Sequence, residues 1–261
     1  MIVNILVAFL LQIIFTVGLI VLFGFLIAQC NKRFYANFGN YGLTVCYITG
    51  ALGTPLHECA HALFCVIFGH KVVEIKLFQI NSDDGVLGYV RHTYNKKNIY
   101  HRAGNFFIGI APIVVISAVL YLLAYLLLPS FVAEISTKFK ISATVSNLGN
   151  IFLGLFEVLQ LFFKCAETWQ WWVFLVLGMF LALHMTLSKA DIKGAMSGIV
   201  FFLVLVLIAD VILGLISGDL LNTFTQGVLS VAGYLLCILV LSLVISVIAV
   251  AVSYVFRALK R

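Results

Sequence analysis

Charged residues are scarce in this chain of 261 residues. Only 10% of the residues are Asp, Glu, Lys or Arg, whereas 63% are hydrophobic and the mean hydropathy is +1.16. Soluble domains carry about 25% charged residues. The composition therefore excludes an ordinary soluble domain and predicts an α-helical polytopic membrane protein. We expect a single integral-membrane domain over residues 1–261, because the apolar runs leave no room for a separate soluble domain.

Several sequence motifs are also missing. The six cysteines form no C-x-x-C pair, and the chain has no phosphate-binding loop and no arrangement typical of a serine or cysteine nucleophile. The cysteines are therefore interpreted as small buried hydrophobic residues. No cluster of basic and aromatic residues resembles a nucleic-acid-binding surface, so no nucleic-acid partner is expected. The net charge of +6 is interpreted instead as lysine and arginine on a cytoplasmic face.

The apolar runs predict about six transmembrane helices. These lie at about residues 3–29, 42–69, 104–128, 170–187, 195–216 and 227–256. Residues 149–163 are apolar but short, so they are interpreted as re-entrant or interfacial. An even number of spans puts both termini on one side, and the face richer in lysine and arginine is cytoplasmic. We therefore predict a multi-pass plasma-membrane protein with both termini in the cytoplasm.

Residues 70–103 are polar and mixed in character, unlike the runs on either side. Two short segments rich in β-branched residues, 72–80 and 86–91, flank Asn81–Gly85. This pattern predicts a small β-hairpin on the cytoplasmic side. Three histidines of this charged segment are expected to be solvated: His70, His92 and His101.

One short motif places three ionisable residues inside the second predicted span. His57, Glu58 and His61 form H-E-x-x-H. Residues four apart share one face of a helix, so the two histidines can hold one metal ion, and the glutamate can act as general base towards a zinc-activated water. Ionisable residues are costly at membrane depth, which favours a functional role. Thr54 and Pro55 predict a helix start or a kink just before the motif.

A catalytic zinc ion commonly has three protein ligands and a water, so a third ligand is needed. Asp191 is the first choice, because the predicted topology brings it to the same side of the membrane as the motif. His184 is the runner-up, as a ligand or as a group beside the site. Glu157 or Glu167 would complete a site of two histidines and a glutamate, but the predicted topology puts both on the outer side.

With these residues in place, the chain resembles the site-2 protease family of intramembrane zinc metalloproteases. The resemblance is carried by the motif His57–His61, by the exit 68–72 into β-structure, by the small-residue and proline helix 103–112, and by Asp191 with Gly194. It covers about residues 42–200, the expected protease core. The Asn-Pro preamble and the adjacent Asp-Gly of the family are absent, and no PDZ domain is recognised. The chain thus resembles a divergent, bacterial-type branch.

The resemblance implies hydrolysis of peptide bonds in membrane-embedded or membrane-proximal substrates, in a bacterial plasma membrane. It implies Zn²⁺ held by His57, His61 and Asp191, with Glu58 as general base and Asn105 or His184 steadying the oxyanion. The expected partners are a membrane protein or peptide substrate and the lipid bilayer, and the oligomeric state is left open. Two other hypotheses use the same polar residues: a transporter or proton relay without metal, and a non-catalytic membrane scaffold.

Overall fold

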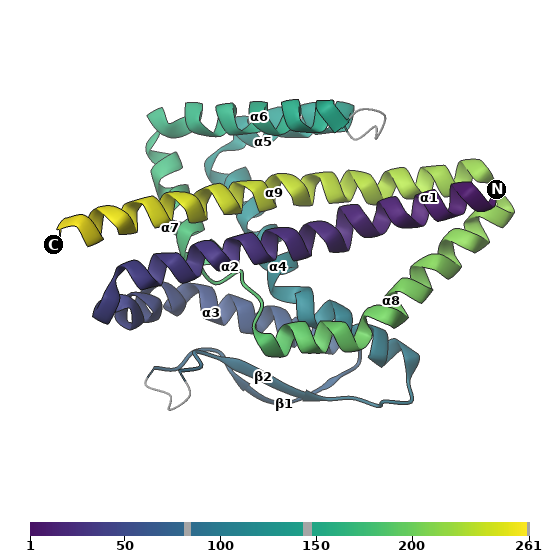
Figure 1. The fold of residues 1–261 in the computed structure, drawn as a ribbon, viewed down its shortest axis with the longest axis horizontal. Helices are drawn as coiled ribbons and strands as arrows, with labels where there is room; N and C mark the ends of the chain where they lie inside the picture. The colour runs from purple at the N-terminus through teal and green to yellow at the C-terminus, as the bar shows by residue number, and fades with distance from the viewer. Residues whose placement is uncertain (81–84, 143–147, 260–261) are drawn as a thin grey trace.

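A computed structural model describes residues 1–80, 85–142 and 148–259 of the chain. These residues form a largely helical molecule with one small two-stranded sheet along one side (Figure 1). The elements are α1 (Ile2–Ile13), η1 (Ile14–Gly18), α2 (Leu19–Asn37), η2 (Gly39–Tyr41), α3 (Gly42–Ile67), β1 (Lys71–Lys76), β2 (Tyr89–Thr93), α4 (Ile99–Leu127), α5 (Pro129–Ser142), α6 (Leu148–Lys164), η3 (Cys165–Glu167), α7 (Trp169–Ala182), α8 (Lys189–Ile216) and α9 (Gly218–Leu259).

Four helices in the described residues are long and apolar enough to cross a membrane. They are the continuous helix formed by α1, η1 and α2, together with α4, α8 and α9. Helices α6 and α7 make a fifth candidate if they count as one span, although they are bent by 118° at their junction. The prediction of an α-helical membrane protein is therefore supported, whereas the count of six spans is not confirmed. The motif helix α3 is not among the four.

The first and last long helices pack side by side and run in the same direction (Figure 1). Near their starts, Gln12 Nε2 donates to Thr225 Oγ1 over 3.2 Å, and near their ends Asn37 Nδ2 donates to Ser253 Oγ over 2.9 Å. The start of α1 and the end of α9 lie at opposite ends of the molecule (Figure 1). This parallel packing does not support the predicted placement of both termini on one membrane face.

The sheet follows the motif helix and contains two antiparallel strands. Lys71 lies opposite Thr93 and Lys76 lies opposite Tyr89, with a bulge in β1 just after its start. The strands are shorter than the segments named from the sequence, and most of the turn expected at residues 81–85 lies outside the described residues. The polar segment between α3 and α4 thus holds paired strands beside the motif helix.

Helix α3 runs without interruption through Pro55, so of the two predicted alternatives the helix start at Thr54 is wrong, and a kink stays a prediction. A proline inside a helix removes one backbone donor and its ring crowds the preceding turn, yet α3 continues on both sides of Pro55. Thr54 is buried against its surroundings rather than capping a helix end. The consequence is that one helix of 26 residues carries the whole motif.

The start of α8 is held close to α4 by glycines. A Cβ atom added to Gly109 would lie 2.5 Å from the Asp191 carbonyl oxygen and 2.7 Å from Ala195 Cβ. One added to Gly198 would clash with the backbone nitrogen of Phe106. Small residues of this kind let two helix backbones approach each other. The first turn of α8 is thereby brought beside the middle of α4.

We predict that Gly109→Ala destabilises the protein and weakens metal binding. The added methyl group has no room, and forcing extra volume into a packed interface costs about 1–3 kcal/mol. Thermal unfolding and zinc content in detergent measure both effects. Gly227→Ala on α9 is the matched control, because an added Cβ there meets no atom within 4 Å and alanine favours a helix. Equal stability of the two variants would contradict this account of the packing.

Candidate metal centre

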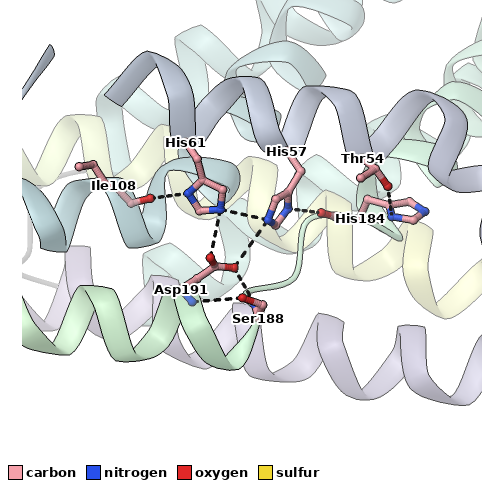
Figure 2. A network of polar contacts seen from close by, with 7 residues as sticks. All are labelled: Thr54, His57, His61, Ile108, His184, Ser188 and Asp191. Atoms are coloured by element: carbon pink, nitrogen blue, oxygen red, sulfur yellow. Dashed lines mark hydrogen bonds and ion pairs between the residues drawn. The ribbon is translucent and has the colours of Figure 1, made fainter. Parts of the chain in front are cut away.

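Three side chains converge between α3 and the start of α8 (Figure 2). The Nε2 atoms of His57 and His61 lie 3.2 Å apart. Asp191 reaches both rings, with Oδ1 3.1 Å from His61 Nε2 and Oδ2 3.6 Å from His57 Nε2. The structure therefore brings together the three residues that the sequence suggested as metal ligands.

Backbone carbonyl groups orient both imidazole rings. His61 Nδ1 donates to the Ile108 carbonyl over 2.8 Å, and His57 Nδ1 donates to the His184 carbonyl over 2.9 Å (Figure 2). With the proton of each neutral ring on Nδ1, the lone pair is on Nε2, and both Nε2 atoms face the same point. Metal-binding histidines commonly donate their other ring N–H to a carbonyl in this way.

The carboxylate of Asp191 is held by the cap of its own helix. The Ser188 backbone N–H donates to Asp191 Oδ2 over 2.7 Å, and the Asp191 N–H donates to Ser188 Oγ over 3.1 Å. This reciprocal pair is a capping box. It explains an acidic residue at this position of α8, but it does not explain why Oδ1 faces His61.

The donor set fits a zinc ion. Tetrahedral zinc with bonds of about 2.0–2.1 Å holds nitrogen and oxygen ligands about 3.3–3.4 Å apart. The three distances between the ligand atoms of His57, His61 and Asp191 lie on both sides of that value, from 3.1 to 3.6 Å. Two nitrogen lone pairs and a carboxylate repel one another unless a proton or a cation lies between them. Three protein ligands also leave a fourth position for water.

Glu58 is buried and lies close enough to interact electrostatically with all three of these residues. Its side chain is covered by the chain near β2, because a Cβ atom on Gly88 would lie 2.8 Å from Glu58 Cγ. The residue is thus beside the donor set but outside it, as expected of a proton acceptor.

His184 does not point its side chain at the metal centre. Its Nε2 lies 3.1 Å from Thr49 Oγ1 and 3.3 Å from Tyr35 Oη, and its Nδ1 lies 3.4 Å from Thr54 Oγ1. A continuous helix from His184 to Asp191 would put the two side chains two turns apart on a similar face. Instead α7 ends before His184 and α8 begins after it, so only the His184 backbone carbonyl serves the site. No sequence signal marks a carbonyl partner such as this one or that of Ile108.

The acidic alternatives to Asp191 are not grouped with histidines. Within the described ranges, the side chains close enough to hold a metal are His57 with His61 and Asp191, and Cys65 with His70 and His92. Glu157 and Glu167 belong to neither group, and Glu167 is exposed.

The expectation that the loop histidines are solvated is wrong for His70, and His101 is half-buried in the same way as His92. His70 is only 5% exposed, and His92 is half-buried. Burial lowers the pKa of both imidazoles, with a smaller contribution from neighbouring histidines. Both rings are therefore neutral near pH 7.

Comparison with known proteins supports a zinc metallopeptidase. Residues 50–166 match the DUF3267 family, whose description reads "Putative zincin peptidase". The matched range contains His57, Glu58 and His61 but ends before Asp191, and it is less than half of the chain. This match does not show that the chain belongs to the site-2 protease family. No curated protein and no solved structure matches the chain.

We predict that Asp191→Asn lowers zinc affinity by more than about 100-fold, the upper range for losing even the partner of a ligand. Asparagine keeps an acceptor for the helix cap but removes the negative charge. Titration with zinc after chelator treatment measures the effect. Asp219→Asn is the matched control, an acidic residue that follows a serine cap in the first turn of α9. His184→Ala should also keep zinc, since its carbonyl remains. Unchanged zinc affinity in Asp191→Asn would show that Asp191 caps α8 and does not bind the metal.

Proposed function

We propose that this protein is an intramembrane zinc metalloprotease of the site-2 protease type. It hydrolyses peptide bonds of membrane-embedded or membrane-proximal substrates. The observation that carries the proposal is the convergence of His57, His61 and Asp191 beside the buried Glu58. This constellation lies in a chain whose described residues include four helices of membrane length.

The residues of the site have separate roles in this mechanism. Zinc at this position would supply a Lewis acid that lowers the pKa of a bound water to about 7. His57 and His61 are held as neutral ligands by the carbonyl groups described above, and Asp191 contributes the negative charge. Glu58 accepts the proton from the attacking water and passes it to the leaving nitrogen of the peptide. Its burial keeps this transfer away from bulk solvent.

The strand region beside Glu58 provides a route for the substrate. A helix hides its carbonyl groups in hydrogen bonds, so a substrate helix must unwind before cleavage. An extended segment can then add to a sheet edge by β-augmentation. The chain near Gly88 lies over Glu58. This segment already pairs with the strand-side residues before the turn, because the Leu87 carbonyl accepts a hydrogen bond from Gln79 N–H over 2.7 Å. We therefore propose residues 86–90 as the docking segment for the unwound substrate.

We predict that Glu58→Gln abolishes cleavage of single-span peptides in proteoliposomes but keeps the metal. Removing a general base costs about 10²–10⁴-fold in rate. Mass spectrometry of the products and metal analysis of the same preparation measure both quantities. Glu167→Gln, an exposed glutamate on η3, is the control and should cleave normally. Zinc-free wild type that conducts protons would contradict the protease proposal and favour a relay.

We also predict that Gly88→Ala reduces cleavage without loss of zinc. Its Cβ would lie 2.8 Å from Glu58 Cγ and 2.9 Å from the carbonyl oxygens of Leu77 and Lys76, so the docking segment must shift. The expected signature is a raised KM together with a lowered kcat, measured by peptide cleavage. Gly218→Ala, where an added Cβ meets no atom within 4 Å, should behave as wild type. Normal kinetics in Gly88→Ala would argue against a substrate route over Glu58.

A further inference from the structure

A second group of metal-ligating side chains lies one turn further along the motif helix. Cys65 near the end of α3, His70 just before β1 and His92 on β2 have ligand atoms within 4.8 Å of one another. The Nδ1 atoms of the two histidines are 3.0 Å apart. None of these residues belongs to the proposed catalytic site.

The His70 ring of this second group is also oriented by the protein. His70 Nε2 donates to the His101 carbonyl over 2.8 Å, so the lone pair of the neutral ring is on Nδ1 and faces His92. The Tyr94 ring stacks on His70 at 4.7 Å between centroids and 13° between planes. A fixed tautomer, a carbonyl partner and a packed ring are the features that orient metal-binding histidines.

Burial makes the group more than a chance surface cluster. Cys65 is fully buried and His70 is nearly so, whereas His92 is half-buried. Cys65 follows His61 by four residues, as His61 follows His57, so all three lie on one face of α3. The same helix face therefore carries ligand atoms for two neighbouring positions.

We propose that Cys65, His70 and His92 form a second zinc site, whose three protein ligands leave a fourth position for water. One thiolate and two imidazoles suit a borderline-soft ion such as Zn²⁺ and disfavour Mg²⁺ or Ca²⁺. Binding replaces the thiol proton, which is released to solvent. The ion joins the end of α3 to β2 and thereby fixes the sheet whose continuation covers Glu58.

Cobalt titration of the full-length, chelator-stripped protein in detergent tests this site directly. Co²⁺ bound to a thiolate gives a charge-transfer band in the near ultraviolet, and a site of histidine and aspartate gives none. The wild type should bind two Co²⁺ per chain and show the band. Cys65→Ser should bind one and lose the band, and His92→Ala should weaken the same site. Cys30→Ser, a cysteine on α2 outside the group, is the matched control and should keep both ions and the band.

The outcomes separate this proposal from the proposed protease function. The double variant His57→Ala/His61→Ala should bind one Co²⁺ with the band intact. Wild type that binds one Co²⁺ without the band would overturn the second site and leave the catalytic site standing. Wild type that binds one Co²⁺ with a band that Cys65→Ser removes would uphold the second site and contradict the catalytic one.

Discussion

Two hydrogen bonds to backbone carbonyl groups determine what the motif can do. The Ile108 carbonyl holds His61 and the His184 carbonyl holds His57, so both Nε2 lone pairs face one point. A pair of histidines on a free helix would rotate and share their protons with water. The fixed tautomers instead come from α4 and from the link between α7 and α8, which are distant in sequence. The candidate metal centre therefore depends on the packing of several helices as well as on the motif.

That packing relies on residues that contribute no side chain to the chemistry. Glycine within a helix costs about 1 kcal/mol relative to alanine. At Gly109 it allows the Asp191 backbone to lie against α4, and at Gly53 it leaves room for the His184 side chain, whose Cβ an added Cβ would meet at 2.6 Å. Each close approach sets the position of one group at the centre, the carboxylate in the first case and the carbonyl that holds His57 in the second. The loss of helix propensity at these two glycines is offset by the close helix packing that they allow.

The parts of the site that were predictable from the sequence are the ionisable side chains, because such residues cost free energy in a membrane environment. A chain with ten acidic residues and six histidines offers few candidates, so H-E-x-x-H and Asp191 were recognisable as a possible set. The helical nature of the chain followed from its apolar runs. The carbonyl partners, the direction of the His184 side chain and the parallel packing of α1 and α2 with α9 were not predictable, because they arise from tertiary contacts. Continuity of α3 through Pro55 was misjudged because local helix-start signals were outweighed by the surrounding packing.

The sequence position of Cys65, four residues after His61, was a signal of metal binding, but the cysteine was interpreted as an ordinary buried residue. A lone cysteine in an apolar run is most often a small buried residue, and Cys65 is indeed buried. Its spacing of four from His61 gains meaning only when His70 and His92 are seen to fold back onto it. The same face of α3 then links the candidate metal centre to the sheet: His57 and His61 face Asp191, and the next turn faces β2. Because Gly88 lies against Glu58 just before β2 begins, any constraint on β2 also acts on the space around the Glu58 side chain. The position of the sheet is thus coupled to the candidate site through Gly88 and Glu58.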